Sequence, residues 1–174
     1  MPIRLAEPTD LPEIVAIYNA AIPGRAATAD LEPVTVEARV AWFREFDPTR
    51  RPLWVHCDVV DGPVTGWFSV RSFYGRPAYH ATAETAVYTA PGRQRRGIGR
   101  ALVRHALVAA PTLGLRTLLA FVFGHNGASL ALFRNAGFDD WGRLPRVAEL
   151  DGVERDLVIL GARVGSPSSA TPAP

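Results

Sequence analysis

The 174-residue chain contains no lysine and only one cysteine, Cys57. All 19 basic residues are therefore arginines, which excludes Schiff-base chemistry and P-loop phosphate binding, because both depend on a lysine. A single cysteine rules out an internal disulfide. Cys57 lies in the apolar run 53–60, where a small core side chain is a far commoner role than a thiol nucleophile.

Long apolar runs are also missing. No stretch approaches the roughly 18 uninterrupted apolar residues of a membrane-spanning helix, and Glu7 interrupts any signal-peptide-like start. We therefore expect a cytoplasmic protein with no membrane partner. The four histidines, at 56, 80, 105 and 125, lack the spacing of metal ligands, so we predict no metal site.

The composition is that of a folded domain, with 48% hydrophobic and 21% charged residues. We expect one domain at 1–164, followed by a small, proline-rich and flexible tail at 165–174. The net charge of +2 is too small to indicate nucleic-acid binding. Arginines nevertheless crowd into 93–104, which predicts that an anion binds there.

Apolar periodicity and turn residues predict the order β-α-α-β-β-β-α-β-α-β-β. We expect strands at 3–5, 53–60, 64–72, 81–89, 118–123, 138–144 and 156–164, and helices starting at residue 11 and at 35–46, 97–110 and 128–136. Strands and helices alternate only in the second half. The prediction is therefore an α/β (α+β) fold, with a mixed central sheet of about seven strands and helices on both faces.

Several local features sharpen this prediction. Asp10 and Glu13 have the spacing of a capping box for the first helix. The second helix is expected to bury Val36, Val40 and Phe43. Strand 118–123 carries no charge, so both of its faces should be buried. Two turns are expected, at Asp61-Gly62 and at residues 151–152.

The most informative segment is 86–102, where a strand enters an Arg/Gly loop that opens a helix. A helix N-terminus presents unpaired N–H groups and a positive dipole end, and glycines allow close approach of the backbone, so the segment suits a diphosphate. A dinucleotide fingerprint is excluded because Leu102 stands where its third glycine is needed. The alternative is a solvated, arginine-rich helix start.

Gln94-Arg95-Arg96-Gly97-Ile98-Gly99 resembles the pyrophosphate-binding pattern Gln/Arg-x-x-Gly-x-Gly/Ala of the GNAT acetyltransferases. The segments at 126–138 are similar to the family's Asn…Ala-Ser-Leu…Leu-Gly-Phe signature. The resemblance covers residues 3–163 and implies the GNAT fold with acetyl-CoA as cosubstrate. It implies cofactor contacts from Val87, Tyr88, Thr89, Gln94, Arg95, Arg96, Gly97, Ile98, Gly99, Arg100, Asn126 and Phe133.

Within GNAT, the sequence at 84–89 looks like the Glu-x-x-Val-Tyr-Val motif of the phosphinothricin and methionine sulfoximine acetyltransferases, which are commonly dimers. We therefore expect acetyl transfer to a small amino acid-like amine, and a possible homodimer through Trp141 and the last strand. Phe133 stands where many GNAT enzymes carry a tyrosine that protonates the CoA thiolate; the subfamily often has histidine there.

The resemblance implies that Glu84 is the general base, acting through a water. Burial among apolar strand neighbours is expected to raise its carboxyl pKa toward that task; the alternative is a surface glutamate. A backbone N–H after a bulge near Tyr88 would bind the thioester oxyanion. Arg76 either clamps a substrate carboxylate or is a solvated turn residue, and Asn126 holds CoA or caps its helix.

Two other functions stay open at this point. One is a non-catalytic acyl-CoA-binding or sensing module of the same fold, against which the presence of Glu84 in an apolar strand argues. The other is a protein N-terminal acetyltransferase, which needs an open peptide groove. The long loop at 22–33 favours closure over a small substrate instead.

Overall fold

The computed structural model describes residues 2–60 and 62–165. Apart from Gly165, the predicted tail at 165–174 lies outside this part of the chain, as does Asp61 of the predicted hairpin turn. No helix within the described ranges is long and apolar enough to cross a membrane.

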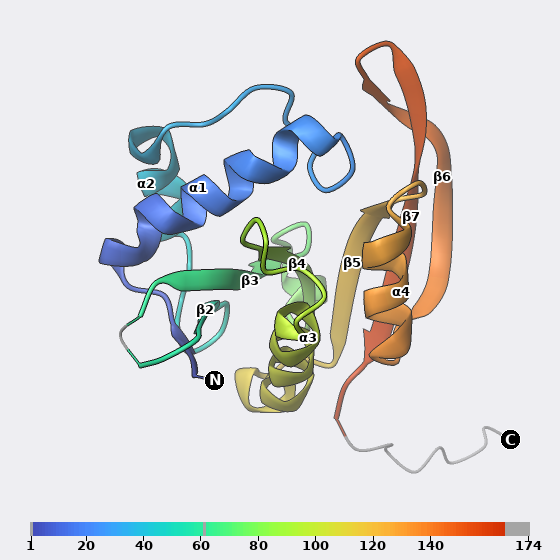
Figure 1. Cartoon of the computed structure of the whole chain (residues 1–174). Helices are drawn as coiled ribbons and strands as arrows, with labels where there is room; N and C mark the ends of the chain where they lie inside the picture. The colour runs from blue at the N-terminus through green and yellow to red at the C-terminus, as the bar shows by residue number, and fades with distance from the viewer. Residues whose placement is uncertain (1, 61, 166–174) are drawn as a thin grey trace, which may run out of the picture.

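One seven-stranded mixed sheet runs through the molecule in the order β1-β2-β3-β4-β5-β7-β6 (Figure 1). Its strands are β1 (Ile3–Leu5), β2 (Leu53–Cys57), β3 (Val64–Ser72), β4 (Thr82–Thr89), β5 (Thr117–Phe123), β6 (Asp139–Leu150) and β7 (Val153–Arg163). Only β4 and β5 pair in parallel; the other neighbours are antiparallel. The predicted mixed sheet of about seven strands is confirmed.

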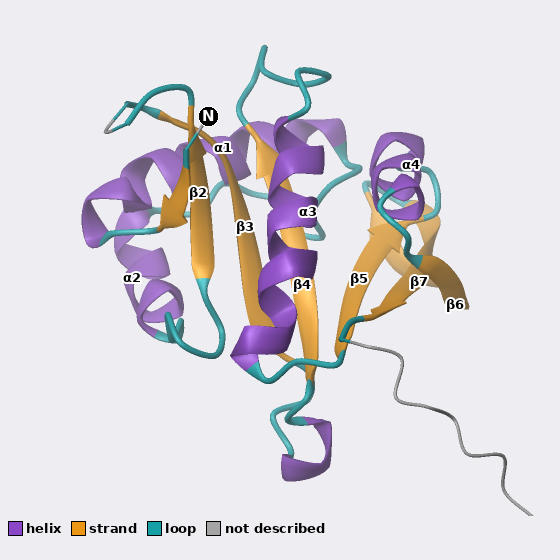
Figure 2. Cartoon of the chain, turned by 90° about the horizontal axis from the view of Figure 1, so that it is seen from below, coloured by secondary structure: helices purple, strands orange, loops and turns teal. Residues whose placement is uncertain are grey.

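Helices cover both faces of this sheet (Figure 2). The helices are α1 (Leu11–Ala21), α2 (Val36–Arg44), α3 (Ile98–Ala109) and α4 (Gly127–Asn135). Helix α3 packs on β2, β3 and β4, and α4 packs on β5, whereas α1 packs on β3 and β4 from the opposite side. The predicted helices on both faces are therefore confirmed.

The two faces bury separate cores, because side chains alternate along each strand. Phe68 of β3 lies with Leu102 and Leu118 in the larger core under α3 and α4. Its neighbour Trp67 lies with Ile14 in the smaller core under α1 and α2. Strand β5 is buried along its whole length except for the half-buried Phe121, as its lack of charge predicted.

The predicted capping box of α1 is wrong. The Asp10 carboxylate makes no cap bond to its helix; it accepts bonds of 2.6 and 2.8 Å from Arg4 and one of 2.7 Å from the Glu7 amide. Burial alone would raise the pKa of Asp10, but these donors outweigh it and hold the pKa below its usual range. Glu13 instead accepts a short hydrogen bond from the Val64 amide of β3.

Two further expectations need correction. Val36, Val40 and Phe43 are only half-buried, because α2 packs chiefly against α1 and an open pocket lies beneath it. The last two strands are longer than predicted and run up to the turn at 151–152. The prediction stopped before Pro145, which lacks an N–H; a register shift between Leu144 and Ala148 accommodates it in β6.

Candidate active site

A gap opens where β4 and β5 separate. Their parallel ladder covers only four residue pairs, from Thr82–Thr117 to Thr85–Ala120. Within the part of the chain that the structure describes, no strand pairs with β4 on that side beyond Thr85. Peptide groups on this edge are therefore open to a ligand. The gap is a pocket of about 610 Å³ lined by both strands, which we call the strand gap.

The predicted bulge is not what exposes the peptide groups of β4. A bulge near Tyr88 is contradicted by the register of β3 with β4, which continues without a shift from Gly66–Thr89 to Ser72–Ala83. The strand gap comes instead from the divergence of β4 from β5. This divergence is a tertiary feature, because it depends on contacts between β4 and β5, whose paired residues lie 35 positions apart in the chain.

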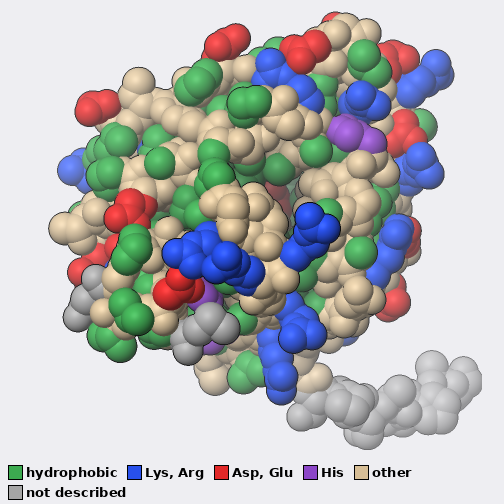
Figure 3. Space-filling model, in the orientation of Figure 1, with side chains coloured by type: hydrophobic (Ala, Val, Ile, Leu, Met, Phe, Trp, Pro, Cys, Tyr) green, Lys and Arg blue, Asp and Glu red, His purple; other side chains and the backbone are tan. Residues whose placement is uncertain are grey.

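The Arg/Gly loop connects β4 to α3 at one end of the strand gap. Gly97 forms the N-cap of α3 with φ 83°, a left-handed conformation that favours glycine. Gln94, Arg95 and Arg96 are exposed beside it, whereas Arg93 forms a 2.7 Å ion pair with Asp58. Arginine side chains gather on this face of the molecule (Figure 3). The loop thus combines the open N–H groups of a helix start with positive charge, as an anion requires.

Two of the predicted loop contacts have structural roles as well. The Ile98 side chain is 2% exposed and belongs to the larger core, so only its backbone faces the loop. A Cβ on Gly99 would lie 3.1 Å from Leu132 of α4, so this glycine also allows α3 and α4 to pack closely. Arg100 is exposed on the first turn of α3, and Thr89 is the last residue of β4.

The α4 side of the strand gap holds the next two predicted residues. The Asn126 side chain accepts a 3.0 Å bond from the Ser129 amide, as the N-cap of α4, and donates a 2.9 Å bond to the Ala26 carbonyl. Phe133 is buried against Phe138 and lines the gap. Asn126 is therefore a cap whose amide already has two protein partners.

A strap formed by residues 25–30 crosses the strand gap, and three side chains, His125, Tyr88 and Tyr18, hold it. His125 Nε2 donates to the Arg25 carbonyl at 2.7 Å, and the Tyr88 hydroxyl donates to the Ala27 carbonyl at 2.9 Å. The Tyr18 hydroxyl of α1 bonds Thr28 and donates to Asp30. The small residues Ala26, Ala27 and Ala29 line the gap from above. The loop expected to close over a substrate is thus anchored on both sides of the gap.

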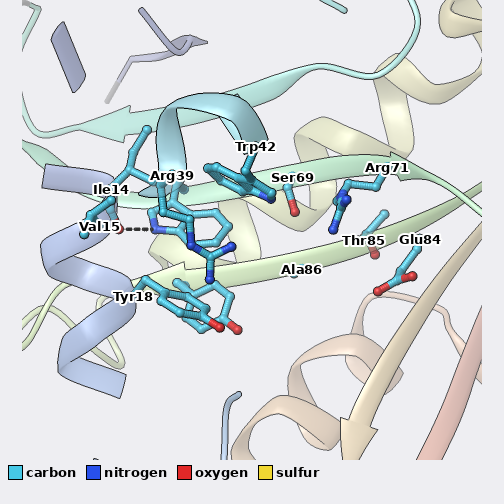
Figure 4. A pocket seen from close by; sticks show the side chains of 12 residues that line it. Ile14, Val15, Tyr18, Arg39, Trp42, Ser69, Arg71, Glu84, Thr85 and Ala86 are labelled. Atoms are coloured by element: carbon cyan, nitrogen blue, oxygen red, sulfur yellow. Dashed lines mark hydrogen bonds between the residues drawn. The ribbon is translucent and has the colours of Figure 1, made fainter. Parts of the chain in front are cut away.

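A second pocket of about 200 Å³ lies between α1, α2 and the sheet (Figure 4); we call it the acceptor pocket. Three successive cross-strand pairs of β3 and β4 form its floor: Trp67–Tyr88, Ser69–Ala86 and Arg71–Glu84. Their side chains share one face because alternate residues of a strand point the same way. The small middle pair makes the hollow, with an aromatic pair at one end and a charged pair at the other.

Four residues line both pockets, Glu84, Thr85, Ala86 and Tyr88, and Glu84 is the carboxylate among them. Its predicted burial is wrong: the side chain is exposed, because β4 is open toward β5 just beyond it. Figure 4 shows its carboxylate at the end of the acceptor pocket, directed away from Trp42. A ligand amine in one pocket and a thioester in the other would meet at this carboxylate.

The two tyrosines near the strand gap are poor proton donors. Burial raises the pKa of Tyr88. Burial also raises the pKa of Tyr18, and its hydrogen bond to Asp30 adds to this effect. Phe133 has no proton to donate, so neither these tyrosines nor Phe133 is suited to protonate a departing thiolate.

Arg76 is not brought together with Glu84. It is exposed and lines a separate hollow with Arg50, Arg51 and His80. The sequence analysis instead missed Arg39, Trp42, Ser69 and Arg71, which line the acceptor pocket. The two-residue spacing of Ser69 and Arg71 marks one strand face, but nothing local indicates that this face meets Arg39 of α2.

Known proteins resemble this chain over most of its length. The model of the acetyltransferase (GNAT) family matches residues 13–138. A provisionally named phosphinothricin acetyltransferase of Bacillus subtilis is 50% identical over 161 residues, covering 92% of this chain and 98% of that protein. The L-methionine sulfoximine/L-methionine sulfone acetyltransferase of Pseudomonas aeruginosa is 31% identical over 168 residues, covering 97% of each chain.

A solved structure extends these similarities to a bound cosubstrate. The GNAT-superfamily phosphinothricin acetyltransferase of Sinorhizobium meliloti, in complex with acetyl-CoA, matches with a TM-score of 0.89 at 26% identity. The match covers 99% of this chain and 92% of that one. The fold around the strand gap is thus shared with a protein that binds acetyl-CoA.

Proposed function

The chain belongs to the GNAT family of acetyltransferases, as its sequence predicted, and we propose that it transfers the acetyl group of acetyl-CoA to the α-amine of a small amino acid. The predicted kinship with the phosphinothricin and methionine sulfoximine enzymes is confirmed by the relatives above. The observation that carries the proposed reaction is that Glu84 lines both the acceptor pocket and the strand gap.

The strand gap suits the pantetheine arm and thioester of acetyl-CoA. Its open β4 edge offers peptide groups to an extended ligand, and Val87, Tyr88 and Phe133 line its walls. The loop at 93–100 would hold the pyrophosphate through the first amides of α3 and the exposed arginines. Asn126 would act chiefly as a cap that positions α4 and the strap.

Glu84 would remove the proton that the amine must lose. An α-amino group has a pKa near 8 in peptides, so a large share is protonated at neutral pH and is not nucleophilic. Once neutral, the nitrogen attacks the thioester carbonyl; a C–N bond forms, the C–S bond breaks and the CoA thiolate leaves. The nitrogen loses a second proton as the amide forms, and this proton passes to solvent or to the thiolate, so the charge balances. Because Glu84 is exposed, a water between the carboxylate and the amine can carry the proton outward.

Arg71 is the cation nearest in register to this base. It pairs across the strands with Glu84, and an α-carboxylate lies two bonds from its amine, so a carboxylate-binding group is needed beside the base. A 2.9 Å bond to Glu45, the C-cap of α2, orients the Arg71 guanidinium. Arg76, which lines a separate hollow, is the other candidate for binding the carboxylate.

A panel of acceptors tests the proposal. Release of free thiol from acetyl-CoA would be measured with small amino acids, the corresponding decarboxylated amines and peptides with free N-termini. We expect amino acids to be preferred. Preference for peptides would favour a protein N-terminal acetyltransferase, and no turnover with any amine would favour a non-catalytic acyl-CoA-binding module. The homodimer and the cytoplasmic location stay predictions from the sequence.

A further inference from the structure

Arg39 lies over the acceptor pocket without a role in the reaction described above. It projects from α2, and Figure 4 shows its guanidinium between Trp42 and Tyr18, directed toward the floor of the pocket. Its Cζ atom lies 4.6 Å from the centre of the Tyr18 ring and 5.4 Å from that of Trp42. Only 22% of the side chain is exposed. An arginine held this way is already oriented before any ligand arrives.

Its hydrogen bonding is incomplete. Nη2 donates a 3.1 Å bond to Asp30 of the strap, which is the only hydrogen bond that Arg39 makes within the described ranges. A guanidinium carries five N–H donors in a planar fork. Several donors therefore remain available to oxygen atoms in the pocket, in a setting with limited access to water.

The pocket separates Arg39 from the reacting end. Glu84 and Arg71 form one end, and Trp67 and Tyr88 form the other. Arg39 belongs to this second end, because it lies over the Tyr18 ring, whose centre is 5.3 Å from that of Tyr88. Tyr88 is four positions beyond Glu84, or about 13 Å along the backbone at 3.3 Å per residue. The small Ser69–Ala86 pair leaves the space between them open. An amino acid with its amine at Glu84 would direct its side chain toward Arg39.

On this basis we propose that Arg39 is a specificity-determining residue, which binds oxygen atoms at the far end of the acceptor's side chain. The inference rests on the proposed function. The aromatic rings pack against the aliphatic part of that side chain, and the guanidinium fork meets a tetrahedral or planar group with two acceptor oxygens, such as a sulfone, phosphinate or carboxylate. Unbranched amino acids with such a group near the end of the side chain are the preferred class, and those with an unoxidised thioether or a hydrocarbon at that place are bound less tightly.

The test compares two acceptors that differ only at the far end, L-methionine sulfone and L-methionine, by steady-state kinetics with saturating acetyl-CoA. In Arg39→Ala we expect KM for the sulfone to rise about 10- to 100-fold, the range for losing hydrogen bonds to a charged group. KM for methionine should change less than about threefold. The matched control is Arg44→Ala, because Arg44 is an exposed arginine on the same helix, away from the pocket.

A second variant separates recognition from support of the strap. Asp30→Asn weakens the Asp30–Arg39 ion pair but keeps the guanidinium, so the ratio of the two KM values should stay close to that of the unchanged enzyme. If Arg39→Ala and Asp30→Asn change both acceptors equally, Arg39 only holds the strap and the inference is overturned. If the unchanged enzyme acetylates neither acceptor nor any other amino acid, the proposed function itself fails, and this outcome is distinct.

Discussion

The two halves of the proposed active site are constructed differently. The cosubstrate side consists of one contiguous segment, the end of β4, the loop at 93–97 and the start of α3, and it offers mainly backbone groups. The acceptor side consists of side chains from α1, α2, β3 and β4, under a strap held by Tyr18, Tyr88 and His125. Backbone groups within one segment are sufficient to bind a cosubstrate. Binding of an acceptor requires side chains brought together from distant parts of the chain.

The largest effect is expected where the two halves meet, at Glu84→Gln. The amide keeps the shape of the carboxylate but cannot accept the amine proton. Loss of a general base typically lowers the rate about 10²- to 10⁴-fold, so kcat should fall by this amount while the Kd for acetyl-CoA stays nearly the same. Single-turnover kinetics and calorimetry measure the two quantities. A nearly normal kcat would mean that the amine loses its proton to another group or to bulk water.

The next largest effect concerns the cosubstrate side alone. Gly97→Glu places a negative charge at the N-terminus of α3 and an L side chain at φ 83°, where a Cβ meets no other atom within 4 Å. We expect calorimetry to detect no binding of acetyl-CoA. Gly97→Gln has nearly the same shape without the charge and should retain weak binding. If both variants bind acetyl-CoA as tightly as the unchanged protein, this loop does not bind the pyrophosphate. Gly99→Glu should also abolish binding, but bulk near Leu132 complicates its interpretation.

A smaller effect should distinguish the two candidate carboxylate-binding arginines on the acceptor side. With an amino acid as acceptor, Arg71→Ala should raise KM about 3- to 10-fold, a modest figure because solvent screens an exposed ion pair. The corresponding decarboxylated amine should show little change. Arg76→Ala should leave both values unchanged if the role belongs to Arg71. The reverse result would return the role to Arg76, as the sequence alone suggested.

The smallest effect on activity is expected at Asp10, which lines neither pocket. Asp10→Asn should lower the free energy of unfolding at pH 7 by about 1 kcal/mol, since it weakens hydrogen bonds to a charged group. The pKa of Asp10 is lowered in the folded state. Its contribution is therefore complete above the unfolded pKa and is lost as pH falls through the folded pKa. Denaturant unfolding should show the difference between the two proteins disappear in acid, with kcat unaffected at pH 7.

Much of the cosubstrate side was predictable because its determinants are local. The glycine at position 97 and the arginines around it lie within one strand–loop–helix unit, so their spacing in the sequence already indicates an anion site. The uncharged β5 likewise predicted a strand buried on both faces. For Asp10 the local pattern gave the wrong prediction. Its spacing to Glu13 suits a capping box, but the carboxylate bonds Arg4 and the Glu7 amide instead.

By itself, the sequence determined the fold class, the family and the position of Glu84 on β4, because strand and helix periodicity and a contiguous motif depend on near neighbours along the chain. Only the tertiary structure decided where Glu84 lies: exposed, at the junction of two pockets, opposite Arg71. It also brought Arg39 over the same floor and left Arg76 in another hollow. The physical reason is that strand divergence, cross-strand register and helix packing are set by contacts between segments that are distant in the chain.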